Sequence, residues 1–190
     1  MTSEVYAKQP TNWVREGIRG TLVLAIICAI SASAITMTRQ HTAPIIAHNE
    51  YVALMNALDR LMPEADTYEQ VDVNGHDVYL GVKNNNVFAA AVPGNRKGFW
   101  GQPLEVLVLV TSDGSLRDVI IRNHGETPGI GTKVESQVFL SQFKDKTLIA
   151  GKRAFSLDDV DIVSGATVSS RAVANGILDA IDLFLALNLK

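Results

Sequence analysis

Residues 104–122, LEVLVLVTSDGSLRDVIIR, decide the class of fold. Two runs rich in Val, Leu and Ile, 104–110 and 116–122, predict β-strands, because such side chains pack well on a pleated surface. Between them lie Ser112, Asp113 and Gly114, which are residue types typical of tight turns. The stretch therefore predicts two consecutive strands of an antiparallel sheet.

Shorter runs of the same kind precede these strands, at 68–73, 78–83 and 87–92. Asn74-Gly75 separates the first two runs and three asparagines, 84–86, separate the next two. Asn and Gly adopt the positive φ angles that tight hairpin turns require, so the region predicts a meander or paired hairpins. Residues 93–103 contain three glycines and are expected to form a loop.

Three segments show the apolar spacing of helices. In residues 49–62 this spacing follows Asn49, a candidate N-cap, and Pro63 stands just beyond the end. A short helix is expected around 134–143, and residues 168–187 show the clearest amphipathic pattern. Together with the strands, these helices predict an α+β domain in which helices pack against a mostly antiparallel sheet.

The N-terminal part of the chain predicts a membrane anchor. Residues 20–38 contain no Asp, Glu, Lys or Arg, and a helix of this length spans about 28 Å, close to the hydrocarbon thickness of a bilayer. Basic residues precede the segment, at Lys8, Arg15 and Arg19. The positive-inside rule therefore places residues 1–19 in the cytoplasm. Residues 39–66 are then a helical connector, and residues 67–190 form a domain in the periplasm of a bacterium.

A cleaved signal peptide is the alternative for the same segment. Residues 22–30 would be its apolar core and Ala32-Ser33-Ala34 its cleavage site. The long N-terminal region before the apolar core favours the anchor, and both alternatives export the rest of the chain.

The composition excludes several classes of protein. Of the 190 residues, 47% are hydrophobic and 19% are charged, which is too apolar a balance for a disordered chain. The net charge of −3 gives no support to nucleic-acid binding. A single cysteine, Cys28, excludes an internal disulfide, and the four histidines show no ligand spacing, so no metal site is expected. No catalytic triad or pair of carboxylates is recognisable either.

The segment 161–170, DIVSGATVSS, leads directly into the last helix and allows two interpretations. Thr167, Ser169 or Ser170 could act as the N-cap, with Gly165 permitting the turn. Alternatively, the unpaired N–H groups at the start of the helix could bind a phosphate, with Arg171 adding positive charge.

Two further loops could contact a ligand. In residues 124–133, Pro128-Gly129 favours a type II turn, and the segment is neither a dinucleotide fingerprint nor a P-loop. Its glycines, beside a Thr and a Lys, could nevertheless bring backbone donors close to a flat polar ligand. Phe99 and Trp100 lie between Gly98 and Gly101, where core packing and an exposed stacking surface are both open.

These motifs together resemble a known family. The segments GFWGQPLEVL (98–107), HGETPGIG (124–131) and DIVSGAT (161–167) occur here in the family's order, after an N-terminal anchor. The chain resembles the covalent-FMN proteins of bacterial respiratory complexes, namely the G subunits of Rnf electron transport complexes. The C subunits of the sodium-translocating NADH:quinone reductase are related to them.

The resemblance implies that Thr167 is joined through its hydroxyl to the phosphate of FMN. A flavin transferase makes this phosphoester, taking FMN from FAD with magnesium. Its recognition motif corresponds here to Asp161, Ser164, Gly165 and Ala166. Thr167 is then an attachment point and not a catalytic nucleophile, and no catalytic residue is assigned. The further residues expected to bind FMN are Trp100, Glu126, Thr127, Gly129, Gly131, Lys133, Ser169 and Ser170.

The function implied by the resemblance is electron relay inside an ion-translocating Rnf complex of the bacterial inner membrane. Its FMN would carry electrons in a chain between ferredoxin or flavodoxin and NAD. The implied partners are the Rnf subunits A, B, C, D and E, and the flavin transferase during maturation. Such a protein is not expected to turn over alone. A free-standing, membrane-anchored flavoprotein reductase and a periplasmic binding domain without flavin are the alternatives.

Overall fold

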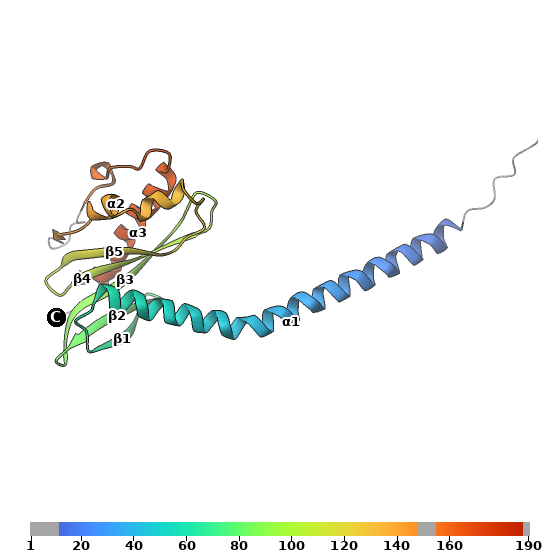
Figure 1. Cartoon of the computed structure of the whole chain (residues 1–190), viewed down its shortest axis with the longest axis horizontal. Helices are drawn as coiled ribbons and strands as arrows, with labels where there is room; N and C mark the ends of the chain where they lie inside the picture. The colour runs from blue at the N-terminus through green and yellow to red at the C-terminus, as the bar shows by residue number, and fades with distance from the viewer. Residues whose placement is uncertain (1–11, 148–154, 188–190) are drawn as a thin grey trace, which may run out of the picture. The chain divides into compact units, whose positions relative to one another are not determined.

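The computed structural model describes residues 12–147 and 155–187 (Figure 1). The chain divides into two compact units, with the boundary between Tyr51 and Val52. The helices and strands, in chain order, are α1 (Trp13–Leu61), β1 (Thr67–Val73), β2 (His76–Lys83), β3 (Asn86–Lys97), β4 (Pro103–Thr111), β5 (Ser115–Asn123), the 3₁₀ helix η1 (Gly131–Glu135), α2 (Gln137–Ser141), β6 (Lys146–Thr147), the 3₁₀ helix η2 (Leu157–Asp159) and α3 (Thr167–Ala186).

The strands form one antiparallel sheet in the order β1-β2-β3-β4-β5-β6, so each strand pairs with its neighbours in sequence. Asn74 and Gly75 join β1 to β2 with φ angles of 54° and 81°, and Asn84 and Asn85 join β2 to β3 with φ angles of 51° and 65°. Two successive positive φ angles are the signature of type I′ hairpin turns, whose twist matches that of the strands. The prediction of an α+β fold with an antiparallel meander is confirmed.

Strand β4 lies in the interior of the domain and is buried on both faces. Val106 and Val108 pack into a cluster with α3, whereas Leu107 and Leu109 pack into a second cluster with Leu58 of α1. Alternate residues of a strand point to opposite faces, so a strand covered on both sides needs apolar residues at every position. This explains the unbroken hydrophobic run in residues 106–110.

Strand β3 is longer than predicted and continues through Pro93 and Gly94, which were expected in a loop. Pro93 lies beyond the last residue that pairs with β2, where β3 pairs with β4 alone, so its missing N–H is tolerated. A Cβ at Gly94 would collide with the carbonyl group of Gly176 in α3. The strand and the helix therefore approach through two glycines, which brings α3 close to the sheet.

Helix α1 is continuous from Trp13 to Leu61, so the prediction that Asn49 caps a separate helix was wrong. An N-cap requires a non-helical residue before it, and the residues before Asn49 are already helical, with Pro44 inside the helix. The last turns of α1 contribute Leu54, Leu58 and Leu61 to the core of the second unit. The expected connector, residues 39–66, thus consists of the end of α1 and the turn before β1.

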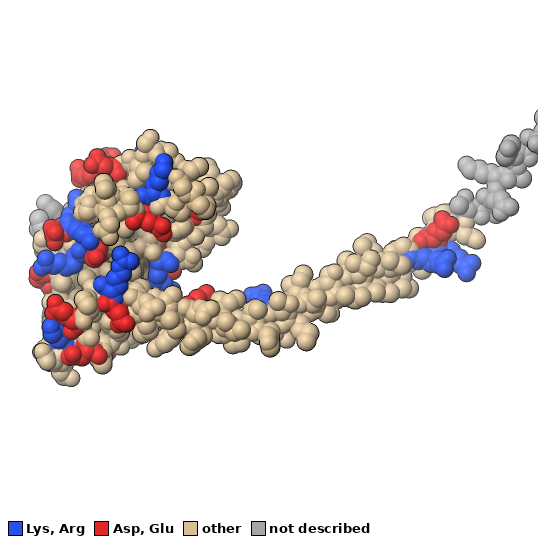
Figure 2. Space-filling view, in the orientation of Figure 1, with Lys and Arg blue, Asp and Glu red and all other residues tan. Residues whose placement is uncertain are grey.

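The apolar part of α1 is long enough to cross a membrane by length and composition. Figure 2 shows a long stretch of this helix without charged side chains, which lies between Arg19 and Arg39 in the sequence. Lys8, one of the basic residues used to orient the N-terminus, lies outside the described residues.

The helix expected around 134–143 consists of two shorter elements, η1 and α2. Ser136 lies between them and caps α2, because its side chain accepts a hydrogen bond from the N–H of Phe139 at 3.4 Å. A capping serine favours a new helix start and so interrupts the segment. Phe139 and Phe143 then pack edge-on in the core, with 5.4 Å between ring centroids.

Candidate functional site

A cleft of about 490 Å³ lies where three loops meet. We call them the aromatic loop (98–102, between β3 and β4), the glycine loop (124–131, after β5) and the helix-entry loop (161–166, before α3). This volume is typical of a small-molecule site. The lining residues are Phe99, Trp100, Glu126, Thr127, Ile130, Gly131, Gly165, Ala166, Thr167, Val168 and Ser169.

Glu126 joins the glycine loop, the aromatic loop and the first turn of α3 through its carboxylate, and the residue is only 8% exposed. Its Oε1 accepts a hydrogen bond from the backbone N–H of Phe99 at 2.8 Å, and its Oε2 accepts one from the hydroxyl of Ser169 at 2.6 Å. A carboxylate is a strong acceptor, and a buried one must be hydrogen-bonded to be tolerated. Glu126 therefore holds the aromatic loop and the start of α3 against the glycine loop.

Two glycines leave the space that this carboxylate occupies. A Cβ built on Gly98 would collide with Oε1 of Glu126, and a Cβ built on Gly131 would collide with Oε2. Any other residue at either position would displace the carboxyl group from its donors. The glycines of the aromatic and glycine loops are thus required by close packing around Glu126.

His124 holds the glycine loop through contacts to the backbone of Glu126 and to the side chain of Glu135. Its Nδ1 accepts a hydrogen bond from the N–H of Glu126 at 3.3 Å, and its Nε2 lies 2.7 Å from Oε1 of Glu135. Nδ1 can accept only when it carries no proton, so this geometry assigns the proton to Nε2, which donates to Glu135. The imidazole thereby links the backbone of Glu126 to η1.

Phe99 and Trp100 form an apolar wall at the edge of the cleft. They are 59% and 65% exposed, so they do not pack in the core. Their rings meet edge to face with centroids 5.2 Å apart, and the indole Nε1 of Trp100 donates to Oγ1 of Thr127 at 2.9 Å. This hydrogen bond and the ring contact fix the wall relative to the glycine loop, and its faces offer a surface on which a flat ligand can stack.

The start of α3 lacks a side-chain cap. The N-cap residue is Ala166, which has no side chain able to bond, so the assignment of this role to Thr167, Ser169 or Ser170 was wrong. Ser169 bonds Glu126 instead, and the hydroxyl of Ser170 accepts from the N–H of Val163 at 3.2 Å. As in any α-helix, the backbone N–H groups in the first turn of α3 have no intrahelical acceptor. Within the described part of the chain, no other acceptor is found for the N–H groups of residues 167–169.

Thr167 is the first residue of α3 and is exposed at the cleft. Within residues 12–147 and 155–187, no group hydrogen bonds to its hydroxyl. The hydroxyl, the unpaired N–H groups and the positive end of the helix dipole together suit a phosphate ester. The apolar wall of Phe99 and Trp100 fits the ring system of FMN, and the start of α3 at residues 167–169, which we call the anion seat, fits its phosphate.

The structure brings most of the residues predicted to bind or carry FMN into this cleft, namely Trp100, Glu126, Thr127, Gly131, Thr167 and Ser169, together with Gly165 and Ala166 of the predicted transferase motif. The other predicted residues do not line it: Asp161, Ser164, Gly129, Lys133 and Ser170. Gly129, with φ of 76°, makes the turn of the glycine loop, whereas Lys133 and Arg171 lie outside the cleft lining.

Sequence reasoning did not assign Ile130 and Val168, which are 54% and 48% exposed and line the cleft. For Ile130 the available signal was a large apolar residue inside a glycine-rich loop, because loops lie at the surface and an apolar residue exposed there can mark a binding site. Among the described residues, no group of three or more His, Cys, Asp or Glu side chains is placed to hold a metal ion.

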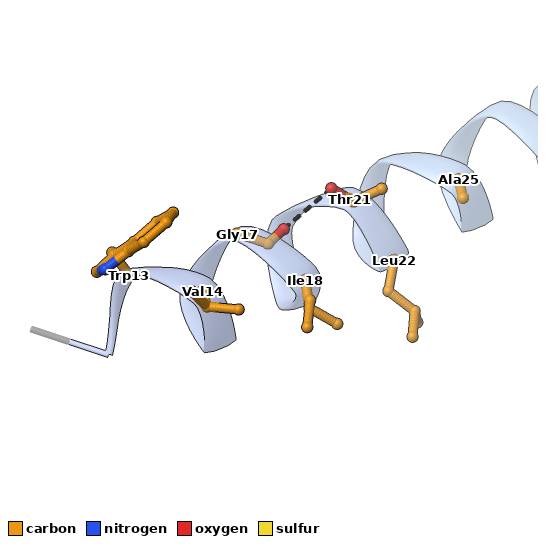
Figure 3. A pocket seen from close by; sticks show the side chains of 7 residues that line it. All are labelled: Trp13, Val14, Gly17, Ile18, Thr21, Leu22 and Ala25. Carbon is orange, nitrogen blue, oxygen red and sulfur yellow. Dashed lines mark hydrogen bonds between the residues drawn. The ribbon is translucent and has the colours of Figure 1, made fainter.

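A second depression, of about 530 Å³, lies on α1 alone and has a different character (Figure 3). Trp13, Ile18 and Leu22 border it, and Thr21 donates its hydroxyl proton to the carbonyl of Gly17 at 3.0 Å. It is a surface groove between the turns of one apolar helix. It offers no group that would orient a polar cofactor, so the cleft between the loops is the candidate site.

Comparison with known families matches both units of the chain. The model of the FMN-binding domain matches residues 98–182, which include all three loops and most of α3. The model of the RnfG N-terminal region matches residues 14–61, which correspond to almost all of α1.

Two of the similar proteins are named as G subunits. The G subunit of the proton-translocating ferredoxin:NAD(+) oxidoreductase complex of Clostridium ljungdahlii is 34% identical over 84% of this chain and 86% of its own length. The G subunit of the Na(+)-translocating ferredoxin:NAD(+) oxidoreductase complex of Acetobacterium woodii is 26% identical over 86% of this chain and 89% of its own. The crystal structure of Shewanella oneidensis NqrC is 27% identical, with a TM-score of 0.47 over 60% of this chain and 59% of that one.

A relative with this identity and coverage, and family models that match both α1 and the three-loop cleft, agree on one assignment. The chain belongs to the RnfG family, the G subunits of ion-translocating oxidoreductase complexes, and carries an FMN-binding domain.

Proposed function

We propose that the chain carries FMN covalently, as a phosphoester of Thr167, and relays electrons within a membrane-bound Rnf complex. The relay would lie in the chain of carriers between ferredoxin or flavodoxin and NAD. The names of the two ferredoxin:NAD(+) oxidoreductase relatives support this reaction. The proposal rests chiefly on the position of Thr167 at the start of α3 and at the cleft, where its hydroxyl has no hydrogen-bond partner among the described residues.

The anion seat favours the phosphate. An N-terminal helix turn with unpaired N–H groups stabilises negative charge by about 0.3–1 kcal/mol at an exposed site, and its donors point at the bound group. Because Ala166 cannot cap, no side chain of the N-cap residue competes for these donors. A phosphate esterified to Thr167 would remain within reach of the N–H groups of its own helical turn.

The other end of the cleft suits the ring system. FMN, once bound, supplies one- and two-electron transfer, and the protein has to position it and exclude competing reactions. Trp100, Phe99 and Ile130 provide exposed apolar surface for a flat ring. Glu126 holds the aromatic loop and the start of α3 in place through its two hydrogen bonds. Because Phe99, Trp100 and Ile130 are exposed, a redox partner would be able to approach the cleft from solvent.

We further propose that α1 anchors the chain in the bacterial inner membrane, with residues 20–38 as the span, the N-terminus in the cytoplasm and residues 67–190 in the periplasm. The match of α1 to the RnfG N-terminal region supports a retained anchor over a cleaved signal peptide. The continuous helix through Ala32-Ser33-Ala34 supports it too, since no loop is present at that site. The other Rnf subunits, A to E, would be the partners.

The test of covalent attachment is in-gel fluorescence. The full chain, produced with and without a flavin transferase, is denatured, separated by electrophoresis and examined for flavin emission. Wild type should fluoresce only with the transferase, Thr167→Ala should be dark, and Thr167→Ser should retain some label. Thr67→Ala is the matched control, because it removes an exposed threonine of β1 that does not line the cleft and should remain labelled.

Stability separates attachment from capping. Since no side-chain cap is lost, Thr167→Ala should change the free energy of unfolding by no more than about 0.5 kcal/mol, whereas loss of a capping threonine costs about 0.5–2 kcal/mol. A dark wild type beside an active transferase would refute the covalent flavin and favour a non-flavin binding domain. Turnover by the purified chain alone would favour a free-standing reductase.

A further inference from the structure

The helix-entry loop shows a contrast between its side chains and its backbone. Asp161, Ser164 and Thr167, at the polar positions of the segment that ends at the proposed attachment residue, are all exposed. The backbone of the same segment is held from the side of the core by side chains that belong to other elements. The most extensive of these contacts comes from Gln142, the residue that ends α2.

The side-chain amide of Gln142 pairs with the backbone of Asp161 in both directions. Its Oε1 accepts from the N–H of Asp161 at 2.8 Å, and its Nε2 donates to the carbonyl of Asp161 at 3.3 Å. Nε2 also donates to the carbonyl of Phe139 at 2.9 Å, which fixes the amide to its own helix. An amide bound in this way imitates one rung of a β-ladder and ties the loop to α2 across 19 residues of sequence.

A second contact holds the middle of the loop. The buried hydroxyl of Ser170 accepts from the N–H of Val163, and the N–H of Ala166 donates to the carbonyl of Val163 at 2.9 Å. Gly165 has φ of 80°, which closes the turn into α3. The loop is therefore bound at Asp161 and at Val163, and its exposed side chains project from a fixed backbone.

We propose that Gln142 is a positioning residue for the modification of Thr167: it holds Asp161 in the conformation that the flavin transferase binds. This inference rests on the proposed covalent attachment. In that reaction the hydroxyl oxygen of Thr167 forms a bond to the FMN phosphorus of FAD, the pyrophosphate bond to the AMP half breaks, AMP leaves and the hydroxyl proton passes to solvent. No electrons are transferred, and Gln142 touches none of the reacting atoms.

The physical effect of Gln142 is on binding. A protein whose binding-competent conformation is only fractionally populated has its apparent affinity reduced by that fraction. The net contribution of one hydrogen bond corresponds to roughly a tenfold change in such a population. Losing the hydrogen bonds between Gln142 and Asp161 should therefore raise the KM of the transferase for this protein about tenfold and leave kcat unchanged.

The test measures label formation on the purified full chain with transferase, FAD and Mg²⁺, at increasing concentrations of the chain. Gln142→Glu keeps the size of the side chain and the acceptor for Asp161, but replaces the amide donor by an oxygen that faces two carbonyls. Gln137→Glu is the matched control, because it introduces the same charge on an exposed residue of the same short helix. We expect the raised KM in Gln142→Glu alone.

Each outcome decides between alternatives. An equal KM for wild type and Gln142→Glu would overturn the assignment, as would a fall in kcat that follows the melting temperature. If Gln142→Glu does not fold, Gln142→Met removes the amide that bonds Asp161 without adding a charge and should raise KM in the same way; an unchanged KM there overturns the proposal. A wild type that takes up no label refutes covalent attachment itself, whereas a labelled wild type with a labelled, kinetically normal variant refutes only the role of Gln142.

Discussion

Replacement of Glu126 by alanine tests whether one carboxylate holds the cleft together. The change leaves two donors without their acceptor, the hydroxyl of Ser169 and the N–H of Phe99. An unpaired buried donor costs about 1–3 kcal/mol. Ser169 is 2% exposed and lies near the upper end of this range, whereas Phe99 is 59% exposed, so water can replace part of its bond. We therefore expect Glu126→Ala to lower the free energy of unfolding by about 2–4 kcal/mol.

Glu126→Gln should be much milder. The amide oxygen can still accept from the Phe99 N–H, and the amide nitrogen can donate to the Ser169 hydroxyl oxygen, so both contacts persist as neutral hydrogen bonds. Charge-assisted bonds are about twice as strong as neutral ones, which predicts a loss of about 1 kcal/mol. The difference between the two variants isolates the hydrogen bonds from the charge.

The assay is urea unfolding of the full chain in detergent, followed by tryptophan emission. The chain has two tryptophans, so a Trp13→Phe background makes Trp100 the sole reporter, and it stands in the cleft itself. Glu135→Ala is the matched control, since this carboxylate is 48% exposed and its contact with His124 should contribute less than about 1 kcal/mol. Equal stabilities of Glu126→Ala and Glu135→Ala would refute the role assigned to Glu126, and equal losses in the Ala and Gln variants would show that the hydrogen bonds do not carry it.

Two further predictions concern the frame of the domain. Gly94→Ala should lower the free energy of unfolding by about 3 kcal/mol or more, because its Cβ would collide with the backbone of Gly176. The control Gly75→Ala meets no atom within 4 Å and should cost only the strain of a positive φ, about 1 kcal/mol. Urea unfolding midpoints compare the two variants, and equal losses of stability would contradict the close approach of Gly94 and Gly176. Burial, together with the hydrogen bond to Asp59 and the charge of that carboxylate, raises the pKa of Tyr68 to about 12. Since the native pKa lies above the unfolded value of about 10, this stabilisation is complete below about pH 10 and is lost as the pH rises toward 12. The stability difference between wild type and Tyr68→Phe should shrink over that interval, and a difference independent of pH would contradict it.

Local chemistry made much of the fold predictable. The two strands of residues 104–122 and the turns at Asn74-Gly75 and Asn84-Asn85 follow from residue preferences that act over a few positions, and the structure has them where they were expected. The uncharged segment of α1 and the resemblance of the three loop motifs were likewise visible in the sequence, and the family models confirm that assignment. The ends of the strands were less predictable. Strand β3 continues through Pro93 and Gly94, where Gly94 packs closely against Gly176 of α3, and no local sequence signal marks that contact.

By itself, then, the sequence determined most of the strands, the last helix, an apolar segment long enough to span a membrane, and the family resemblance of the loops. Only the tertiary structure decided how the loops work together. Glu126 was expected to bind the cofactor; it lines the cleft, and its carboxylate also bonds Phe99, 27 residues away, and Ser169, 43 residues away. Ser170 was expected at the cofactor and holds Val163, while no sequence signal distinguishes Gln142 from any other polar residue. A side chain's partner depends on which distant segments the sheet and α3 bring within about 3 Å, and neither spacing nor residue type encodes that distance along the chain.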